Sequence, residues 1–411
     1  MQEDNWISEV LNECQNVETP RSWIWWSLCA AVSAAASNNY EVISFKGNVT
    51  FKPNMYIILL GDSGLGKAFG INLSKLLVQA ADVTRVIAGR SSVQGIIKEI
   101  ATARSRENGK VPFIDARAFV VNGELSSAIV TDTEALGMLT DLYDGSVNEK
   151  WDSLLKGEGF IKLNNPYITA LFGTSQAHFY DKIPQANIDG GYIGRNLIIY
   201  EEKRFQYVDP FDLDDKDIEN RIKTFVVPKY SKYLKEIADK KGRILLSNPC
   251  KELHNSWRKK WRGTQQLDKT GFLNRVPDHI IKVAMCICLS RYNNDLIINE
   301  FDMADAIEKV TSLVYANKIS SEGKGLDPLA SQTKFVLNQL ISAENYELRQ
   351  KLLLSRGLGM YQSDGLNKIL ETLLEMGWIQ RKRHVAGTAS DWLIQLSGEP
   401  LENHKKFKEK K

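Results

Sequence analysis

The chain has 411 residues and a mass of 46.4 kDa, which exceeds one ordinary hydrophobic core and predicts two or three domains. A hydrophobic content of 43% and a charged content of 25% exclude a disordered or fibrous chain. The formal net charge of +3 does not by itself require a nucleic-acid partner. Residues 379–411, however, hold eight Lys/Arg against four Asp/Glu, which assigns the positive excess to the C-terminus.

Compartment is inferred from the cysteines and from the N-terminal and apolar segments. Five scattered cysteines lack metal-ligand spacing, which favours a reducing compartment over a disulfide or zinc framework. The first residues have no signal-peptide layout. The longest apolar run, residues 23–36, is too short to span a bilayer. We therefore expect a cytoplasmic protein with no membrane partner.

The first 200 residues alternate between helical and strand patterns. Residues 5–37 predict two helices, the second capped by Thr19 with Pro20 at its first position. Residues 40–51 predict a hairpin. Four apolar runs then predict strands of a buried parallel sheet with helices between the first three, which is an α/β fold. These runs are residues 55–60, 118–121, 167–172 and 196–200.

The second half of the chain has a different character. Residues 212–217 form an acidic linker, and the segment that follows is mostly helical to about residue 319. Residues 320–329 have linker composition. Residues 331–342, 346–355 and 363–376 then predict three helices. A strand from Trp378-Ile379, a polar turn over residues 380–387 and a returning strand at residues 392–396 complete a winged-helix order.

A phosphate-binding motif follows the first buried strand. Gly61-Asp-Ser-Gly-Leu-Gly-Lys67 has the Walker A spacing and leads into a helix at residues 71–81. The glycines allow close backbone approach, the helix N-terminus attracts anions, and Lys67 reaches the terminal phosphates. The alternative is a glycine-rich turn without a ligand. The predicted nucleotide-binding residues are Gly61, Asp62, Ser63, Gly64, Leu65, Gly66, Lys67, Ala68 and Phe69.

The usual Mg²⁺ ligands of this motif are missing. Ala68 stands where a Ser or Thr hydroxyl is expected, and Gly123 stands before Glu124 where an Asp is expected. Three explanations stay open. Asn122, Glu124 or Asp62 holds the metal in an altered geometry, the site binds ATP without turning it over, or Ala68 is an introduced substitution.

The order of these motifs resembles that of AAA+ replication helicases of phages and mobile elements, which are similar to minichromosome-maintenance helicases. The resemblance extends from about residue 5 to 319 and includes the winged helix. It implies that Glu124 polarises the attacking water and that Thr174 or Ser175 senses the γ-phosphate. It also implies that Arg195 acts on a neighbouring subunit's nucleotide and that Arg275 begins the sensor-2 helix of the lid. For the two arginines, a surface position and an ordinary salt bridge are the respective alternatives.

Three groups of basic or polar residues are candidates for DNA contact. Residues 151–162 predict a hairpin, which the resemblance places in a ring pore with Lys156 or Lys162 on the DNA backbone; a purely structural hairpin is the alternative. Arg381, Lys382 and Arg383 in the predicted wing would neutralise phosphates. The third C-terminal helix offers few base-reading residues, namely Gln362, Asn367 and Lys368, and a protein-contact role for this module stays open.

The sequence thus predicts an α/β P-loop AAA+ core with a helical N-terminal segment and a helical lid, followed by a C-terminal winged-helix domain. The expected divisions are residues 1–50, 51–250, 251–320, 331–397 and a basic tail at 398–411. The expected function is a ring-forming, ATP- and Mg²⁺-dependent DNA translocase or helicase, acting as a hexamer on single-stranded DNA, with duplex DNA or other replication proteins as further partners. The alternative is a nucleotide-dependent DNA-binding initiator or helicase-loading assembly with weak or no hydrolysis.

Overall fold

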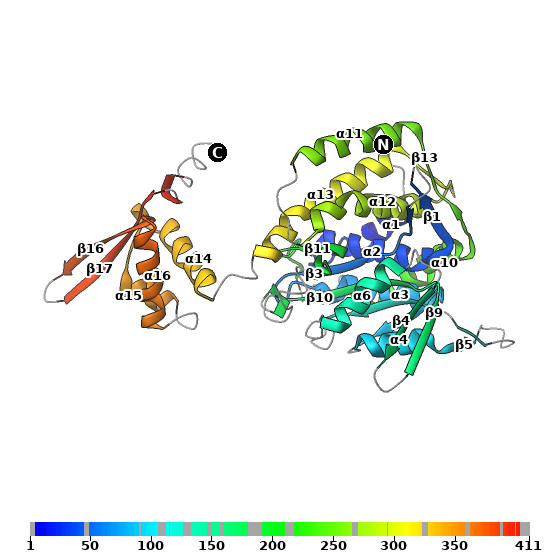
Figure 1. The fold of residues 1–411 in the computed structure, drawn as a ribbon, viewed down its shortest axis with the longest axis horizontal. Coiled ribbons are helices and arrows are strands. Elements are labelled where there is room, and N and C mark those ends of the chain that lie inside the picture. Colours follow the sequence, from blue (N-terminus) through cyan, green and yellow to red (C-terminus); the bar gives the residue numbers. More distant parts are fainter. Residues whose placement is uncertain are drawn as a thin grey trace. The chain divides into compact units, whose positions relative to one another are not determined.

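The computed structural model divides the chain into two compact units, Met1–Ser321 and Glu322–Lys411, each with its own core (Figure 1). The first unit contains all the residues predicted as N-terminal helices, nucleotide-binding core and lid. The structure describes residues 5–44, 49–89, 92–105, 112–114, 116–125, 133–145, 150–155, 159–176, 178–179, 191–209, 218–264, 270–293, 295–322, 328–357, 362–386, 389–398 and 400–402.

A five-stranded parallel sheet forms the centre of the described part of the first unit, in the order β11-β3-β10-β7-β4. The interior strand β3 is buried along its whole length, which explains why it is a continuous apolar run. The four predicted strands are confirmed. The bounds are β3 Tyr56–Leu60, β4 Arg85–Ala88, β7 Arg117–Asn122, β10 Tyr167–Thr174 and β11 Asn196–Tyr200.

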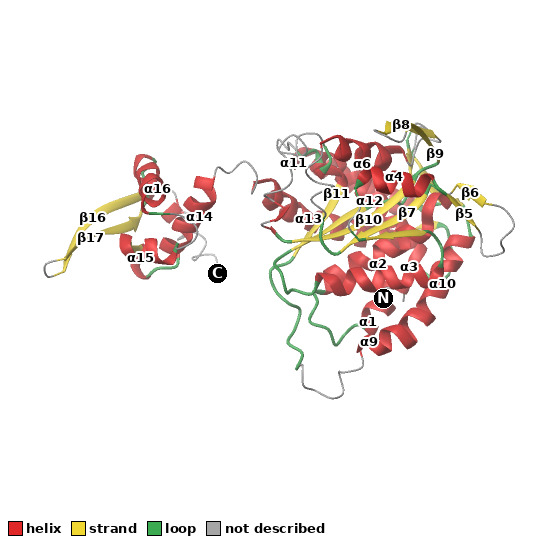
Figure 2. Ribbon diagram, turned by 90° about the horizontal axis from the view of Figure 1, so that it is seen from below, coloured by secondary structure: helices red, strands yellow, loops and turns green. Residues whose placement is uncertain are grey.

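Helices cover both faces of this sheet (Figure 2). Because successive side chains of a strand point to opposite faces, Ile57 and Leu59 pack with one helical layer and Ile58 and Leu60 with the other. The first layer contains α2 (Arg21–Ala36) and α3 (Lys67–Ala81), and the second contains α4 (Val93–Ala101) and α6 (Thr133–Gly145). The helix α2 is buried nearly all round, which accounts for its Trp- and Ala-rich sequence.

The start of α2 differs from its prediction. Pro20 is the N-cap residue of α2, no side chain caps the helix, and α1 (Trp6–Glu13) precedes it. The Thr19 hydroxyl instead donates a hydrogen bond to the carbonyl of Gly66, 3.1 Å away. Thr19 was therefore wrongly predicted as a cap, because a distant acceptor takes its hydroxyl.

Further helices and short strands complete the first unit. The antiparallel pairing of β1 with β2 confirms the predicted hairpin at residues 40–51. Its predicted turn and the predicted acidic linker at 212–217 both lie outside the described residues. The strands are β1 Tyr40–Ile43, β2 Thr50–Phe51, β5 Ala103–Ser105, β6 Pro112–Ile114, β8 Lys150–Leu155, β9 Gly159–Asn164, β12 Gly242–Arg243, β13 Leu245–Leu246 and β14 Ile297–Ile298. The helices are α9 Ile218–Arg221, the π-helical turn η3 Ile222–Val226, α10 Val227–Asp239, α11 Asn248–Thr264, α12 Phe272–Ser290 and α13 Glu300–Glu322.

The first helix of the second unit, α14, begins at Pro328, and α13 extends to Glu322. The linker is therefore shorter than the predicted residues 320–329. The three-stranded antiparallel sheet of the second unit, β15-β17-β16, packs on helices around buried Leu and Ile side chains. Two predictions were wrong: Glu347–Arg349 forms a strand, and residues 380–384 are strand, not turn. The bounds are α14 Pro328–Ile341, β15 Glu347–Arg349, α15 Gln350–Arg356, α16 Ser363–Glu375, β16 Ile379–Ala386 and β17 Ala389–Leu396.

A bilayer-spanning helix would need a long, almost uncharged apolar segment. Within the described ranges, no helix of either unit meets that requirement.

Candidate functional site

A glycine loop (Gly61–Lys67) connects the interior strand β3 to α3. Gly66 is the N-cap residue of α3 and has φ 90°, in the left-handed region that side-chain-bearing residues avoid. The first-turn amides of a helix have no carbonyl partner within the helix, and no side chain caps α3. The loop therefore directs backbone N–H groups and the positive end of the α3 dipole outward, an arrangement that suits an anion.

The N-terminal helix α2 supports this loop from beneath. The Trp23 indole donates a hydrogen bond to the Ile199 carbonyl, 3.0 Å away, which ties α2 to β11. A Cβ at Gly61 would lie 2.8 Å from the Trp23 ring and 2.5 Å from the carbonyl oxygen of Glu201. Trp23 of α2 contacts the start of the loop at Gly61, and Thr19, just before α2, bonds to its end at Gly66. The segment around the start of α2 therefore holds the loop at both ends. Sequence reasoning missed Thr19 and Trp23 as site residues.

Lys67 lies folded onto the glycine loop. Its ammonium donates hydrogen bonds to the carbonyls of Gly61 at 2.6 Å and Asp62 at 2.8 Å, and lies 5.6 Å from the Trp23 ring centroid. Partial burial lowers the pKa of Lys67, and the carboxylates of Asp62 and Glu124 oppose that shift. Lys67, Asp62 and Glu124 are therefore close enough to interact electrostatically.

A second cation touches the glycine loop from the segment after β11. Arg204 donates a hydrogen bond to the Gly64 carbonyl at 3.0 Å and pairs with the carboxylate of Glu18. No sequence pattern marks Arg204, since its position in a polar segment after a strand is common to many surface arginines. Arg204 adds a guanidinium to the rim of the loop.

The ends of β7 and β10 lie at the same edge of the sheet as the glycine loop. Gly61 N–H donates to the Thr174 carbonyl at 3.2 Å, and Leu125 N–H donates to the Gly173 carbonyl at 2.6 Å. The Asn122 side chain accepts from the Glu124 N–H at 3.1 Å and donates to the Gly89 carbonyl. Glu124 is thus held on a short turn facing the loop, as expected of parallel strands whose carboxyl ends meet.

Thr174 and Ser175 differ in accessibility. Thr174 is buried and Ser175 is half-buried, and the Ser175 hydroxyl accepts the N–H of His178 at 3.3 Å. The His178 ring forms a hydrogen bond with the Leu125 carbonyl at 3.1 Å. His178, which the sequence analysis did not select, therefore braces the turn that carries Glu124.

For Mg²⁺, the oxygen donors near the loop are those of Asp62, Asn122 and Glu124. The described residues contain no group of three or more His, Cys, Asp or Glu side chains able to hold a metal. Magnesium in nucleotide sites is held by one or two carboxylates together with phosphates and water. The donor set therefore fits an ion shared with a phosphate chain, with Ala68 and Gly123 contributing no ligand.

Arg195 lies at the amino-terminal ends of the sheet strands, whereas the glycine loop lies at their carboxyl-terminal ends. It directly precedes β11, whose first residue pairs with Tyr56, so it stands six residues, or about 20 Å, along the strands from Gly61. It is 8% exposed, pairs with the Asp144 carboxylate and donates to the Gly191 carbonyl at 2.9 Å. The surface alternative for Arg195 is therefore wrong, and the residue cannot reach the glycine loop of its own chain.

Arg275, near the start of α12, lies beside Arg195. Both guanidinium groups approach within 4 Å of the point that a Cβ on Gly191 would occupy. Burial lowers the pKa of Arg275, and the charge of Arg195 lowers it further. The structure thus brings together two of the predicted arginines, at the edge remote from their own glycine loop.

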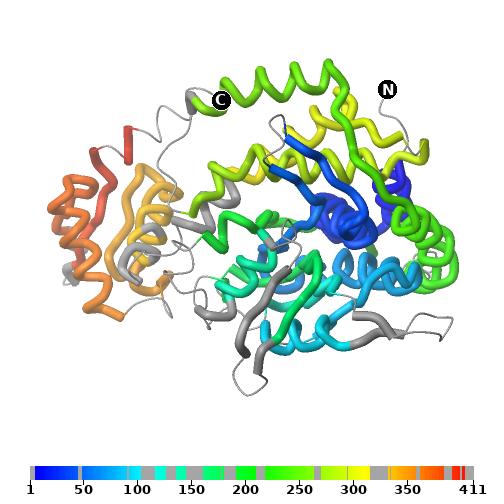
Figure 3. The backbone as a smooth tube through the Cα atoms, turned by 45° about the vertical axis from the view of Figure 1, so that its right-hand side comes forward, coloured from blue at the N-terminus to red at the C-terminus, as the bar shows by residue number. Residues whose placement is uncertain are grey.

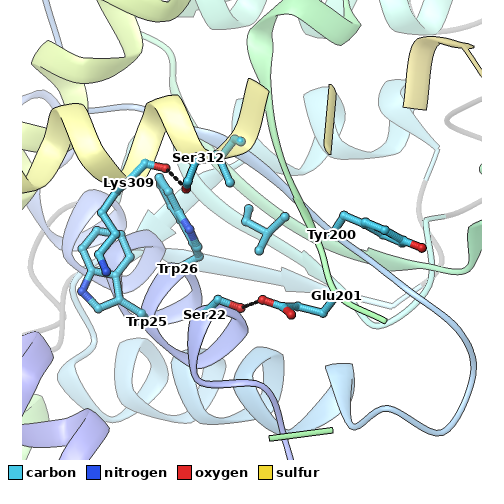
Figure 4. Close-up of a pocket in the computed structure, with 9 residues that line it drawn as sticks. Ser22, Trp25, Trp26, Tyr200, Glu201, Lys309 and Ser312 are labelled. Atoms are coloured by element: carbon cyan, nitrogen blue, oxygen red, sulfur yellow. Dashed lines mark hydrogen bonds between the residues drawn. The ribbon is translucent and has the colours of Figure 1, made fainter. Parts of the chain in front are cut away.

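A cavity of about 270 Å³ lies beside Glu201, on the far side of β11 from the glycine loop (Figure 4). Its walls come from α2, the end of β11 and α13, and they include the indoles of Trp25 and Trp26. The Ser22 hydroxyl donates a hydrogen bond to the Glu201 carboxylate within it, and the Lys309 ammonium lies 5.1 Å from the Trp25 ring centroid. The cavity combines flat aromatic walls with a fixed carboxylate.

The predicted DNA-contact residues fall into separate places. The hairpin at residues 151–162 is confirmed as β8 paired with β9; Lys162 is exposed on β9, and Lys156 lies outside the described residues.

In the second unit, Arg381 is half-buried, 4.4 Å from the Trp392 ring centroid, and donates to Gln350. Gln350 in turn donates to Asn367, so these residues link β16 to α16. Lys382 and Arg383 are exposed, and the tail from residue 403 lies outside the described residues.

The fold and the site define a mixed α/β protein with a glycine loop at the end of an interior strand of a parallel sheet. No protein-family model matches the chain, and a search of curated proteins finds no match. The functional assignment therefore depends on the geometry described above.

Proposed function

We propose that this chain is a nucleotide-dependent ATPase of the AAA+ type that acts on DNA, with a P-loop core and a C-terminal winged helix. One observation carries the proposal. The glycine loop follows β3 in a sheet ordered β11-β3-β10-β7-β4, Thr174 ends the adjacent strand β10, and Glu124 follows β7, the strand beyond β10. The groups proposed to bind phosphate and to activate water therefore lie at the carboxyl ends of neighbouring strands, which supports the proposal.

The loop amides and α3 would bind the phosphates, and Lys67 would leave its bonds to the Gly61 and Asp62 carbonyls for phosphate oxygens. Glu124, held by Asn122, would accept a proton from the attacking water. Ser175, the more accessible of the two predicted sensor residues, would contact the terminal phosphate. Bound Mg²⁺ would neutralise developing phosphate charge, with Glu124 or Asp62 as its protein ligand.

Arg195 and Arg275 would serve the nucleotide of a neighbouring copy. Arg195 stands about 20 Å along the strands from its own loop and Arg275 lies beside it, which supports a role in trans and therefore a homo-oligomer. A guanidinium group supplied by a neighbour stabilises transition-state charge on the transferred phosphoryl group. The resemblance to AAA+ helicases suggests a hexameric ring, with the exposed Lys162 on a hairpin as a candidate contact to a DNA strand.

The nucleobase would occupy the cavity beside Glu201. Glu124 and Thr174 lie on the β10 side of β3, so the terminal phosphate points that way and the base extends toward β11. The cavity walls of Trp25 and Trp26 suit a planar base, and the Glu201 carboxylate can accept from the adenine amino group.

The deciding experiment is ATP turnover with and without single-stranded DNA, comparing this chain with Lys67→Ala and Ala68→Thr. Turnover that Lys67→Ala abolishes would support the motor. If the chain binds ATP without turnover and Ala68→Thr, alone or with Gly123→Asp, restores it, the motor is complete except for its metal ligands. Apart from its two chain neighbours, no described residue has an atom within 4 Å of a Cβ at Gly123, which leaves room for the start of an aspartate side chain. A chain that binds no nucleotide would refute the proposal.

A second candidate is a nucleotide-dependent DNA-binding assembly that hydrolyses ATP weakly or not at all. Ala68 and Gly123 favour it, because both usual protein ligands of the metal are missing. Nucleotide-dependent oligomerisation without turnover in any of the variants would select this candidate over the motor.

A further inference from the structure

The largest concentration of positive charge identified in the chain lies outside the site described above. Residues 240–264 contain eight Lys/Arg and one Asp/Glu, a formal net charge of +7, against +3 for the whole chain. The C-terminal segment 379–411 carries +4. The assignment of the positive excess to the C-terminus was therefore wrong, because most of it precedes or lies within α11.

The helix α11 is an outer helix of the first unit, with α12 and α13 between it and the sheet (Figures 1 and 3). Leu253, Trp257 and Trp261 recur every four residues and pack against the core. The two indoles stack with centroids 5.4 Å apart, and Trp261 donates a hydrogen bond to the Leu273 carbonyl at 3.2 Å. This apolar face fixes which side of α11 meets solvent.

The cations of α11 occupy the solvent side. Residues at an i, i+4, i+7, i+11 spacing form one stripe along the helix. The stripe contains the cations Lys251, Arg258 and Arg262 and the uncharged Asn255. All four are exposed. At 1.5 Å per residue the stripe is about 16 Å long. Lys259 and Lys260 widen it, and both are also exposed.

Few acidic residues lie near the stripe: Glu252 is exposed next to Lys251, and burial raises the pKa of Asp278 in α12 while the charges of Lys282 and Arg258 oppose that rise. None of the ion pairs formed by the described residues includes a residue of α11, and the sequence has no Asp or Glu from Leu253 to Thr264. The helix α10 differs, because its exposed Lys232 and Lys235 share the surface with Glu236 and Asp239. The helix α11 thus combines dense positive charge with a rigid support.

We propose that this face of α11 binds the phosphodiester backbone of a nucleic acid. Arginine guanidinium groups form charge-assisted, bidentate hydrogen bonds with phosphate oxygens, and a row of cations matches a row of phosphates. Within the stripe, Asn255 is the residue whose side chain could bond to base edges, and the cations would contact phosphates. Binding would therefore be largely independent of nucleotide sequence. The contact goes beyond the proposed ATPase, since it needs neither nucleotide nor the second unit.

The test measures binding of a labelled oligonucleotide to the full chain without nucleotide, as a single strand and as a duplex, from about 50 to about 200 mM salt. Arg258→Gln with Arg262→Gln removes two cations. We expect the slope of log K against log salt to flatten by about 1.4 for a single strand or about 1.8 for a duplex. The strand form with the larger loss identifies which of the two uses the stripe. Lys232→Gln with Lys235→Gln on α10 makes the same charge change and should leave the slope unaltered.

Three results would overturn the proposal: equal losses in the α11 and α10 variants, an unchanged slope in the α11 variant, or no DNA binding by the unmodified chain. If the first α11 variant unfolds, Lys251→Gln with Lys259→Gln tests the same face. ATP binding that depends on Lys67 is measured in parallel. Its absence would refute the proposed function and leave the DNA result interpretable.

Discussion

At position 61 the structure has room for a hydrogen atom and little else. Trp23 and the Glu201 carbonyl both lie closer to a Cβ than van der Waals contact allows. We expect Gly61→Ala to displace the glycine loop, to lower ATP affinity at least about tenfold, and to cost about 1–3 kcal/mol of stability. Titration with a fluorescent ATP analogue and thermal melting measure the two effects. Gly123→Ala is the matched control, because its Cβ meets no atom within 4 Å; equal losses in both would disprove the packing argument.

Arg195 gives a prediction that separates neighbouring subunits. Arg195→Ala should abolish turnover and leave ATP affinity nearly intact, because the residue lies far from its own loop. Mixing Arg195→Ala chains with Lys67→Ala chains should restore part of the turnover, since some interfaces then combine an intact Lys67 with an intact Arg195. If affinity falls as much as turnover while assembly is unchanged, or if mixing restores nothing, the role in trans is wrong.

Among single residues, those that belong to one short motif could be predicted from the sequence. The glycine loop and Lys67 were found because the motif occupies seven consecutive positions after an apolar strand. Thr19, Trp23 and Arg204 were not found, because they reach the loop from far along the chain and no local pattern marks them. Asp144, which holds Arg195, was missed for the same reason.

At the scale of elements, one contact joins α12 to the turn before β11. The buried His279 ring donates a hydrogen bond to the Gly194 carbonyl at 3.0 Å, and burial lowers the pKa of His279 from 6.5 to about 3. The ring is thus neutral in the folded chain, whereas in the unfolded chain it gains a proton below about pH 6.5. This contribution to stability is full above that pH and is lost as the pH falls from 6.5 toward 3.

We expect the stabilising effect of His279 to fall by about 2 kcal/mol between pH 7 and pH 5. Denaturant unfolding at both pH values measures it. His279→Gln keeps a donor for the Gly194 carbonyl and removes the titrating group, so its stability should vary less with pH. If the variant and the unmodified chain lose equal stability on acidification, His279 does not carry the effect.

Elements were predicted well where burial requires a continuous run of apolar residues. The four long strands are continuous apolar runs because helices cover both faces of the sheet. The edge strand β4, residues Arg85–Ala88, was missed because it is short and only partly buried. The strand β16 was predicted as a turn over residues 380–384, since its exposed Lys382 and Arg383 resemble loop composition.

At the scale of the whole molecule, the two units have separate cores, with α13 ending at Glu322 and α14 beginning at Pro328. We expect a chain truncated after Glu322 to keep its melting temperature and its ATP affinity. It should retain the part of the salt-dependent DNA binding that α11 supplies and lose the part supplied by Lys382 and Arg383. Calorimetry and oligonucleotide titrations measure these properties. A truncated chain that aggregates or no longer binds ATP would show that the first unit is not self-sufficient.

The support of the glycine loop by both Trp23 and the residues after β11 has a consequence for biosynthesis. The strand β3 pairs with β10 and β11, and none of these partners exists when the loop leaves the ribosome. At 5–20 residues per second, translation from Gly61 to Arg204 takes roughly 7–29 s. During that interval the apolar strand β3 has neither of its neighbours in the sheet. We therefore expect nucleotide at the proposed site to stabilise the first unit only after β11 and the residues that follow it have been made.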